Sequence, residues 1–146
     1  MDDKRTIRVG LIGAGTIGKG VVDLLTKNGK LITERTGVSV NLVAVCDKDN
    51  VALDAVTLPG VIKTDDVEKV LNNKDIDIVV ELIGGLHPAK DFIMRAIGNR
   101  KNVVTANKAV ISNFGREVFS SALENNVLVG FEASVGGAIP IIRVLK

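Results

Sequence analysis

The stretch "IRVGLIGAGTIGKG", residues 7–20, contains the pattern that decides the fold. Its first half is apolar without polar alternation, which is typical of a strand buried on both faces of a sheet. Three glycines then follow in the spacing G-x-G-x-x-G, and apolar residues at helical spacing begin directly after them. A glycine loop between a strand and a helix is the context in which this spacing binds a dinucleotide, although 15 glycines in the chain could also produce it by chance.

Each glycine of this loop has a physical task. Gly13 lets the chain turn tightly, Gly15 lets the backbone approach a pyrophosphate, and Gly18 lets the helix pack close to the strand. A pyrophosphate would meet free N–H groups and the positive end of the helix dipole. The residues expected to contact the cofactor here are Gly13, Ala14, Gly15, Thr16, Ile17 and Gly18.

The rest of the chain alternates strand-like and helix-like segments. Further apolar runs rich in Val and Ile lie at 40–45, 76–83, 102–105 and 127–132, and a short strand is expected near Val61. Helical spacing covers 16–35, 65–71, 88–99 and 113–125. This alternation predicts an α/β fold, a Rossmann-like, doubly wound, mainly parallel sheet with helices on both faces.

Composition narrows the function. The 146 residues, of which 46% are hydrophobic and 25% charged, fit one domain over 1–146. A net charge of +2 without a long basic run argues against nucleic-acid binding and favours a small-molecule ligand. A single cysteine, the lack of a signal-like start and the lack of an apolar stretch of about 18 residues predict a cytoplasmic protein without a membrane partner.

Asp47 follows the second expected strand, where a cofactor's adenosine ribose would be bound. A carboxylate there accepts both ribose hydroxyls and repels a 2′-phosphate, which favours NAD. Asp47 lies 29 residues after Gly18 (47 − 18), more than the usual spacing of about 20, as a long first helix would explain. Lys48 could serve a phosphate, although an ordinary solvated lysine is the more common case.

Four motifs together are similar to those of homoserine dehydrogenases. They are "GLIGAGTIGKGVVDLL", "DIVVELIGG", "VVTANKAVI" and "FEASVGGAIPII", in this order along nearly the whole chain. The resemblance implies an NAD(P)-dependent oxidoreductase that interconverts L-homoserine and L-aspartate 4-semialdehyde, on the route to threonine and methionine. It also implies a substrate-binding and dimerisation region beyond residue 146, so the chain is expected to be the nucleotide-binding domain of a longer, homodimeric enzyme, with the fragment's own oligomeric state open.

Lys108 lies at the junction of an expected strand and helix. Ligands of open α/β sheets bind outside the carboxyl ends of the strands, which places this lysine near a nicotinamide ring. Oxidation of an alcohol by hydride transfer also requires a proton acceptor close to the hydroxyl. From the residues alone, a solvated loop lysine is the more common case. The resemblance, by contrast, implies that Lys108 is catalytic and contacts the cofactor.

Two further cofactor contacts are expected at Gly84 and Gly85, which follow the strand within "DIVVELIGG". Glycines there let the backbone pass close to a flat ring or a ribose, although a simple turn before Pro88 is an equal alternative. His87, the single histidine, has no partner nearby in sequence and receives no catalytic role.

"FEASVGGAIP" raises the question of a cation. One carboxylate followed by a glycine-bent loop of carbonyls suits a hard ion, although from the residues alone a Glu132 that caps the following turn is the more common case. The resemblance implies a structural sodium ion held by the Glu132 side chain and by the carbonyls of Val135, Gly137 and Ile139.

The cofactor preference and the function keep alternatives. Many homoserine dehydrogenases place an arginine for the 2′-phosphate of NADP just before the aspartate, and Cys46 stands at that position here. NAD is therefore expected, with NADP possible. A nucleotide-binding module without chemistry would leave Lys108 and "EASVGG" unexplained, and an oxidoreductase acting on another amino-acid semialdehyde would explain Lys108 but not the C-terminal motif.

Overall fold

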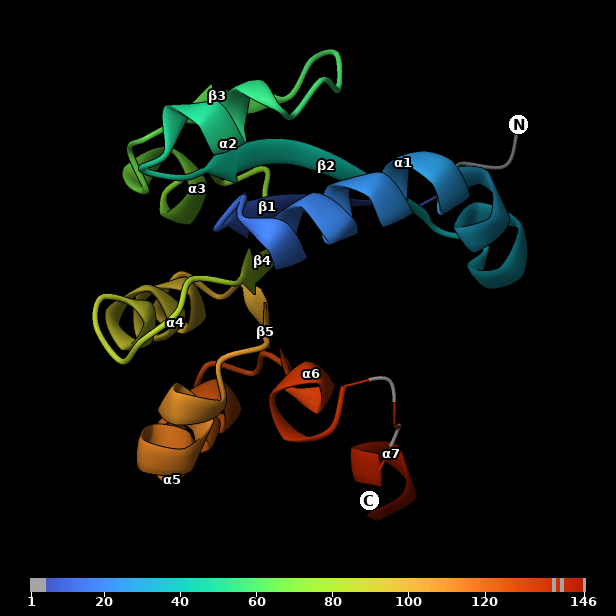
Figure 1. Cartoon of the computed structure of the whole chain (residues 1–146). Helices are drawn as coiled ribbons and strands as arrows, with labels where there is room; N and C mark the ends of the chain where they lie inside the picture. Colours follow the sequence, from blue (N-terminus) through green and yellow to red (C-terminus); the bar gives the residue numbers. More distant parts are fainter. Residues whose placement is uncertain (1–4, 138, 140, 146) are drawn as a thin grey trace.

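In the described residues, the sheet contains six strands, all paired in parallel. The computed structural model describes residues 5–137, 139 and 141–145. The strand order is β3-β2-β1-β4-β5-β6 (Figure 1). The strands are β1 (Thr6–Ile12), β2 (Ser39–Cys46), β3 (Ile62–Thr64), β4 (Ile78–Glu81), β5 (Asn102–Thr105) and β6 (Val129–Gly130). The predicted Rossmann-like, doubly wound fold is therefore confirmed.

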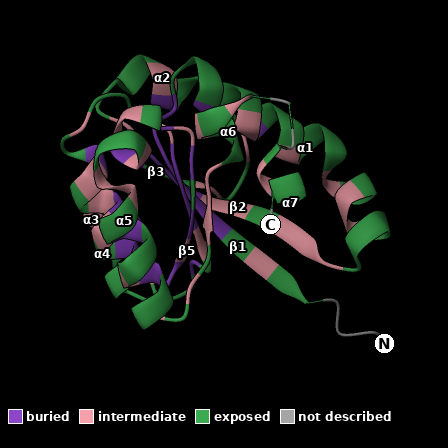
Figure 2. Ribbon diagram, turned by 90° about the horizontal axis from the view of Figure 1, so that it is seen from below, coloured by how far each residue is buried: buried purple, intermediate pink, exposed green. Residues whose placement is uncertain are grey.

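Helices cover both faces of the sheet. They are α1 (Thr16–Thr36), α2 (Asn50–Asp54), α3 (Glu68–Leu71), α4 (Ala89–Gly98), α5 (Lys108–Glu124), α6 (Glu132–Val135) and α7 (Ile141–Leu145). In Figure 2 the buried strands run between α3, α4 and α5 on one side and α1 and α6 on the other. None of the helices in the described ranges combines the length and the apolar character needed to cross a membrane.

The core consists of one apolar cluster on each face of the sheet. Ile93 and Ile97 of α4 and Val118 of α5 pack on one face, and Val22 of α1 and Leu53 of α2 pack on the other. The strands supply mostly Val and Ile to both clusters because their residues alternate between the two faces. This two-sided burial explains why the strands read as continuous apolar runs.

Several boundaries differ from the sequence expectations. Helix α5 begins at Lys108 instead of residue 113, because the Asn107 side chain accepts a hydrogen bond from the N–H of Val110 at 3.1 Å and caps the helix. Helix α2, which was not expected, is capped in the same way by Asp49, which accepts from the N–H of Val51 at 2.9 Å. The last expected strand, 127–132, shortens to two residues, and Glu132 begins α6 instead of ending a strand.

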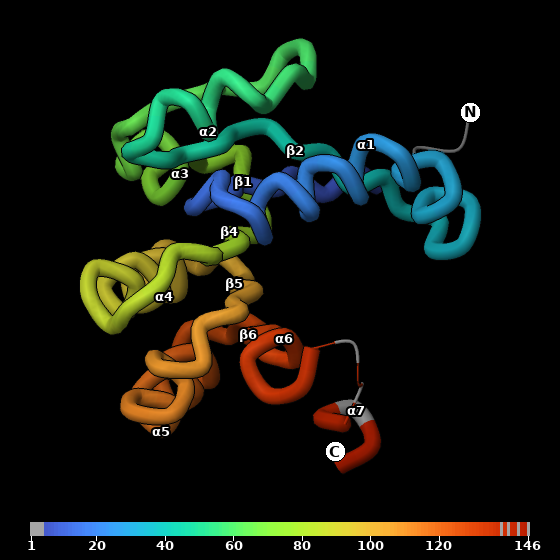
Figure 3. The backbone as a smooth tube through the Cα atoms, viewed as in Figure 1, coloured from blue at the N-terminus to red at the C-terminus, as the bar shows by residue number. Residues whose placement is uncertain are grey.

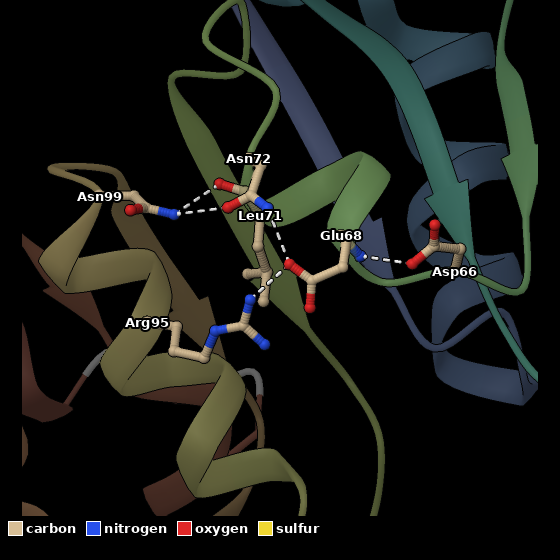
Figure 4. Close-up of polar contacts among 6 residues, drawn as sticks. All are labelled: Asp66, Glu68, Leu71, Asn72, Arg95 and Asn99. Carbon is tan, nitrogen blue, oxygen red and sulfur yellow. Dashed lines mark hydrogen bonds and ion pairs between the residues drawn. The ribbon is translucent and has the colours of Figure 1, made fainter.

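A polar brace joins α3 to α4 on the outside of the sheet (Figure 4). Arg95 of α4 donates to Glu68 of α3 at 2.5 Å, and Asn99 donates to the carbonyl of Leu71 at 2.9 Å. The hydrogen bond from Arg95 lowers the pKa of Glu68. Helix α3 begins at Glu68 instead of residue 65 because the Asp66 carboxylate first accepts from the Glu68 N–H at 3.0 Å.

The chain beyond α5 returns to the sheet at its edge. Figure 3 shows the path from α5 through β6 into α6 and then α7. The ring of Phe119 in α5 lies 4.9 Å from that of Phe131, between their centroids, which packs the start of α6 against α5. The segment that follows β6 is thereby held against α5.

Candidate functional site

The candidate site lies at the carboxyl ends of β1 and β4, which are neighbours at the centre of the sheet. The chain leaves β1 towards β2 and leaves β4 towards β5, so successive connections diverge at this point. Divergence of this kind opens a crevice outside the strand ends, and ligands of doubly wound sheets bind there.

The glycine loop lies at the carboxyl end of β1, next to the crevice. Gly13 has a φ of 102°, and its N–H donates to the carbonyl of Cys46 at 2.8 Å. A Cβ on Gly18 would lie 2.0 Å from the carbonyl oxygen of Gly13 and 3.6 Å from the side chain of Leu11. The close approach that needs Gly18 is therefore mainly to the loop itself, and only secondarily to the strand.

Gly15 occupies the N-cap of α1 and faces open space. Among the described residues, no heavy atom apart from those of the two adjoining residues lies within 4 Å of a Cβ built on Gly15, and no side chain caps the helix. The first turn of the helix contains no acidic residue. The first amide groups of this 21-residue helix, among them those of Thr16 and Ile17, are consequently available to an anion.

Asp47 and Lys48 stand beside the loop in different arrangements. The Asp47 carboxylate accepts from the N–H of Ala14 at 2.5 Å and from that of Asp49 at 2.9 Å. Lys48 is exposed, and its ammonium donates to the carbonyl of Asp65 at 2.8 Å. Asp47 is therefore fixed at the glycine loop, whereas Lys48 is turned towards the segment after β3.

Cys46, the residue before Asp47, is buried. Its side chain packs in the apolar cluster that includes Val70 and Leu71. Burial raises the pKa of the Cys46 thiol to about 11, so the group is uncharged at neutral pH. This position cannot contribute a charge to a phosphate site.

A cleft of about 220 Å³ brings the separate motifs together. Its lining comes from Ile17 in the glycine loop, the turn of Gly84 and Gly85, and the segment that contains Lys108. Gly85 has a φ of 83°, which a residue with a Cβ rarely adopts, and Gly84 has open space where a Cβ would be. Lys108 is exposed, and no other residue in the described part of the chain bonds to its ammonium.

Three buried polar residues at this cleft did not emerge from the sequence as site residues, and of these Asn107 lines the cleft while the other two do not. They are Glu81 at the end of β4, Thr105 at the end of β5, and Asn107. Glu81 and Thr105 are entirely buried. Burial raises the pKa of Glu81, and hydrogen bonds from Thr105, Ile83 and Asn107 oppose this shift. A glutamate inside the apolar run "IVVELI" was the available signal.

The segment with the expected sodium ligands lies at the neighbouring strand end. Ser134 of α6 donates to the carbonyl of Thr105 at 2.8 Å, which ties α6 to β5. Glu132 is exposed, and the carbonyl of Ile139 accepts from the N–H of Ile141 at 2.8 Å. Among the described residues no three His, Cys, Asp or Glu side chains gather as metal ligands, so a cation here would depend on one carboxylate and on carbonyls.

The fold and this site together define the class of protein as a dinucleotide-binding domain. The family model described as "Homoserine dehydrogenase, NAD binding domain" matches residues 13–132. This match covers most of the chain, and the chain belongs to that family.

Named relatives agree with this membership. A homoserine dehydrogenase of Synechocystis is 43% identical over 97% of this chain and 32% of the relative. A homoserine dehydrogenase of Bacillus subtilis is 39% identical over 97% of this chain and 33% of the relative. The crystal structure of a homoserine dehydrogenase from Thiobacillus denitrificans has a TM-score of 0.90 and 42% identity, and it matches 97% of this chain and 32% of its own. The chain spans about a third of the length of the curated relatives it matches.

A more distant structure agrees in fold. A hyperthermophilic archaeal homoserine dehydrogenase in complex with NADPH has a TM-score of 0.78 at 23% identity and matches 97% of this chain and 48% of its own. At this identity the comparison supports the fold alone.

Proposed function

We propose that this chain binds NAD(P) across the carboxyl edge of its sheet, as the nucleotide-binding part of an enzyme that interconverts L-homoserine and L-aspartate 4-semialdehyde. The observation that carries this proposal is the cleft that joins Ile17, the Gly84–Gly85 turn and Lys108. The same three motifs are far apart in sequence, and only a ligand that extends from the glycine loop to Lys108 uses them all.

The glycine loop would hold the pyrophosphate. Gly15 leaves room for the phosphates, and the uncapped first turn of α1 offers N–H groups and a positive dipole end to them. The six residues of the loop, Gly13, Ala14, Gly15, Thr16, Ile17 and Gly18, would line this part of the cofactor.

Asp47 would bind the adenosine ribose. Two of its acceptor positions are used by the N–H groups of Ala14 and Asp49, and the remaining ones can accept ribose hydroxyls. Its negative charge opposes a 2′-phosphate, and the ammonium of Lys48 already donates to the carbonyl of Asp65. These contacts support NAD as the preferred cofactor.

Lys108 would serve the chemical step. The cofactor, when bound, accepts or returns a hydride. Alcohol oxidation also releases a proton from the substrate hydroxyl, and the Lys108 amine is the group at this cleft that can accept it. Gly84 and Gly85 would let the cofactor ring lie against the backbone beside this lysine.

A sodium ion is a second part of the proposal. The Glu132 carboxylate and the carbonyls of Val135, Gly137 and Ile139 are oxygen donors within eight residues, the kind that a hard cation prefers. We expect the melting temperature of the chain to be higher in sodium chloride than in choline chloride of equal ionic strength. Glu132→Gln should remove this difference, and an equal melting temperature of the unaltered chain in both salts would contradict the site.

Calorimetric titration with NAD tests the binding mode. Gly15→Val should abolish measurable binding because the side chain would occupy the space of the phosphates. Gly20→Val is the matched control, since Gly20 lies in α1, the helix whose N-cap is Gly15, and a Cβ on Gly20 likewise has none of the described residues within 4 Å except its neighbours and the backbone of its own helix. Equal NAD affinity of the two folded variants would contradict a pyrophosphate at Gly15.

Turnover assays test the chemical role. The 146-residue chain should bind NAD without oxidising homoserine, because a longer protein would supply groups that orient the substrate. In that longer protein, Lys108→Ala should lower kcat by about 10² to 10⁴, as expected when proton transfer is lost. Lys108→Arg is the control that keeps the positive charge but cannot release a proton, and it should be equally impaired. Near-normal kcat in either variant would support a nucleotide-binding module in which Lys108 is merely solvated.

A further inference from the structure

Glu81 places a carboxyl group inside the core, where carboxyl groups are rare. Glu81 is the last residue of the central strand β4, and its relative exposure is 0%. It follows Val79 and Val80, which belong to the two apolar clusters of the core. A carboxyl group buried here costs stability unless each of its oxygens has a partner.

Both oxygens of Glu81 have such partners. Across the parallel pair of β4 and β5, Glu81 lies in register with Thr105, whose hydroxyl donates to Oε2 at 2.6 Å. The other oxygen, Oε1, accepts from the N–H of Ile83 at 2.8 Å. One side chain therefore fixes the strand end of β5 and the first turn of the loop that leads to Gly84.

The contacts continue to the residue before Lys108. The Thr105 hydroxyl accepts from the N–H of Asn107 at 3.0 Å. The Asn107 side-chain amide donates to the carbonyl of Gly85 at 2.7 Å and to that of Ile83 at 3.2 Å. Its oxygen caps α5 through the N–H of Val110 at 3.1 Å. Lys108 is the first residue of that capped helix.

We propose that Glu81 is the positioning residue that sets Lys108 against the Gly84–Gly85 turn. This inference rests on the proposed function, because it assigns the network a task in holding the nicotinamide end of the cofactor. Glu81 does not line the cleft, so it would act through Thr105 and Asn107 and not by contact with the ligand. A network of this kind fixes the two walls of the cleft before the ligand arrives, which lowers the cost of ordering them on binding.

Two ligands separate positioning from plain stability. NADH reaches both halves of the site, whereas ADP-ribose lacks the nicotinamide ring and uses only the glycine loop and Asp47. Loss of the network should weaken NADH binding by about tenfold and change ADP-ribose binding by less than about twofold. A residue that only stabilised the fold would not discriminate between the two ligands.

The variants separate the effect of side-chain shape from the effect of the hydrogen bonds. Glu81→Gln keeps the shape but removes one of the two acceptor oxygens, and Thr105→Val keeps the shape but removes the hydroxyl. Thr105→Ser restores the hydroxyl without the methyl group and should recover most of the NADH affinity. Thr64→Val is the matched control, because Thr64 is a buried threonine at the end of β3 whose hydroxyl likewise accepts a backbone N–H, that of Asp66, at 3.0 Å.

Calorimetric titration of the 146-residue chain with NADH and with ADP-ribose gives the result. Selective loss of NADH affinity in Glu81→Gln and Thr105→Val, with recovery in Thr105→Ser, is expected. Faster amide hydrogen exchange at Asn107 and Val110 without ligand is the expected second readout, because both N–H groups lie in the network. Should Glu81→Gln fail to fold, the threonine pair decides alone.

Four results would overturn the inference, and they differ in meaning. Equal loss of both ligands in Thr105→Val, or the same pattern in Thr64→Val, would reduce Glu81 to a structural residue. Unchanged NADH affinity in a folded Thr105→Val would show that the network does not contribute to NADH binding. If the unaltered chain bound neither ligand, the proposed function would fail first, and the positioning role would fail with it.

Discussion

The two halves of the candidate site are built by different means. On the side of β1 and β2, backbone groups make the part of the site proposed for the phosphates: the turn at Gly13, the open N-cap at Gly15 and the free amides of α1. On the side of β4 and β5, the buried side chains of Glu81, Thr105 and Asn107 hold the cleft together.

The difference shows two ways to place a ligand. A backbone site depends on the absence of side chains, so it needs glycines and tolerates little added volume. A side-chain site depends on partners, and no described buried side-chain polar atom lacks one. A substitution should therefore disrupt the backbone site through steric conflict, and it should disrupt the side-chain site by leaving a polar group without a partner.

Gly18→Ala should have the largest effect. The new Cβ would lie 2.0 Å from a backbone carbonyl oxygen that cannot move without the loop, which should lower the free energy of unfolding by about 3 kcal/mol or more. Gly20→Ala, two residues later in the same helix, has free space and should raise it by up to about 1 kcal/mol. Urea unfolding measures both, and a loss of similar size in the two variants would remove the steric argument.

Asp47→Asn should change cofactor choice on the backbone side. The substitution keeps one acceptor oxygen and removes the charge that repels a 2′-phosphate, so the ratio of NAD to NADP affinity should fall by about tenfold. Asp49→Asn is the control, since Asp49 is exposed and caps α2 by accepting from the N–H of Val51. If both variants show the same ratio of calorimetric affinities, Asp47 does not select the cofactor.

Glu81 should give the side-chain half a pH dependence. Burial raises its pKa in the folded state, so the folded state keeps the proton to higher pH than the unfolded chain does. The stability that this provides is complete below the ordinary carboxyl pKa and is lost as pH rises through the folded pKa, with a slope of at most about 1.4 kcal/mol per pH unit. Relative to Glu81→Gln, the unaltered chain should therefore lose stability as pH rises from about 4.5, the ordinary pKa of a glutamate.

Glu68→Gln supplies a control of opposite sign for this measurement. The hydrogen bond from Arg95 lowers the pKa of Glu68, so its contribution is present above the ordinary pKa and is lost as pH falls. Urea unfolding of the three proteins across the acidic and neutral range compares the slopes. Slopes of the same sign for both glutamates would contradict the assigned environments.

Ser134→Ala should have the smallest effect. It removes one neutral hydrogen bond, to the carbonyl of Thr105, and should cost about 0.5–1.5 kcal/mol of the free energy of unfolding. Ser120→Ala, at an exposed position of α5, should be neutral or slightly stabilising because alanine favours helices. A neutral Ser134→Ala would mean that α6 does not depend on this contact with β5.

Sequence patterns predicted the local parts of this arrangement. The bounds of β5 agree with those expected, and α1 ends within one residue of its expectation, at the left-handed Gly37. The glycine spacing predicted the turn at Gly13, because a positive φ is adopted mainly by glycine and the residue type therefore indicates it. The expected start of α5 was five residues too late. The helix begins where the Asn107 side chain caps it, and the spacing of apolar residues does not indicate a cap.

The sequence alone therefore determined the glycine loop, the motif that contains Lys108 and the order of the strands and longer helices along the chain, since each depends on neighbours in the chain. Only the tertiary structure decided that Glu81 meets Thr105, 24 residues away, and that Asn107 reaches Gly85, 22 residues away. Those contacts follow from the parallel register of β4 and β5, in which residues 81 and 105 lie opposite each other. Register is set by the packing of the whole sheet between its two layers of helices, and a buried carboxyl group has a favourable place only after that packing supplies both of its partners.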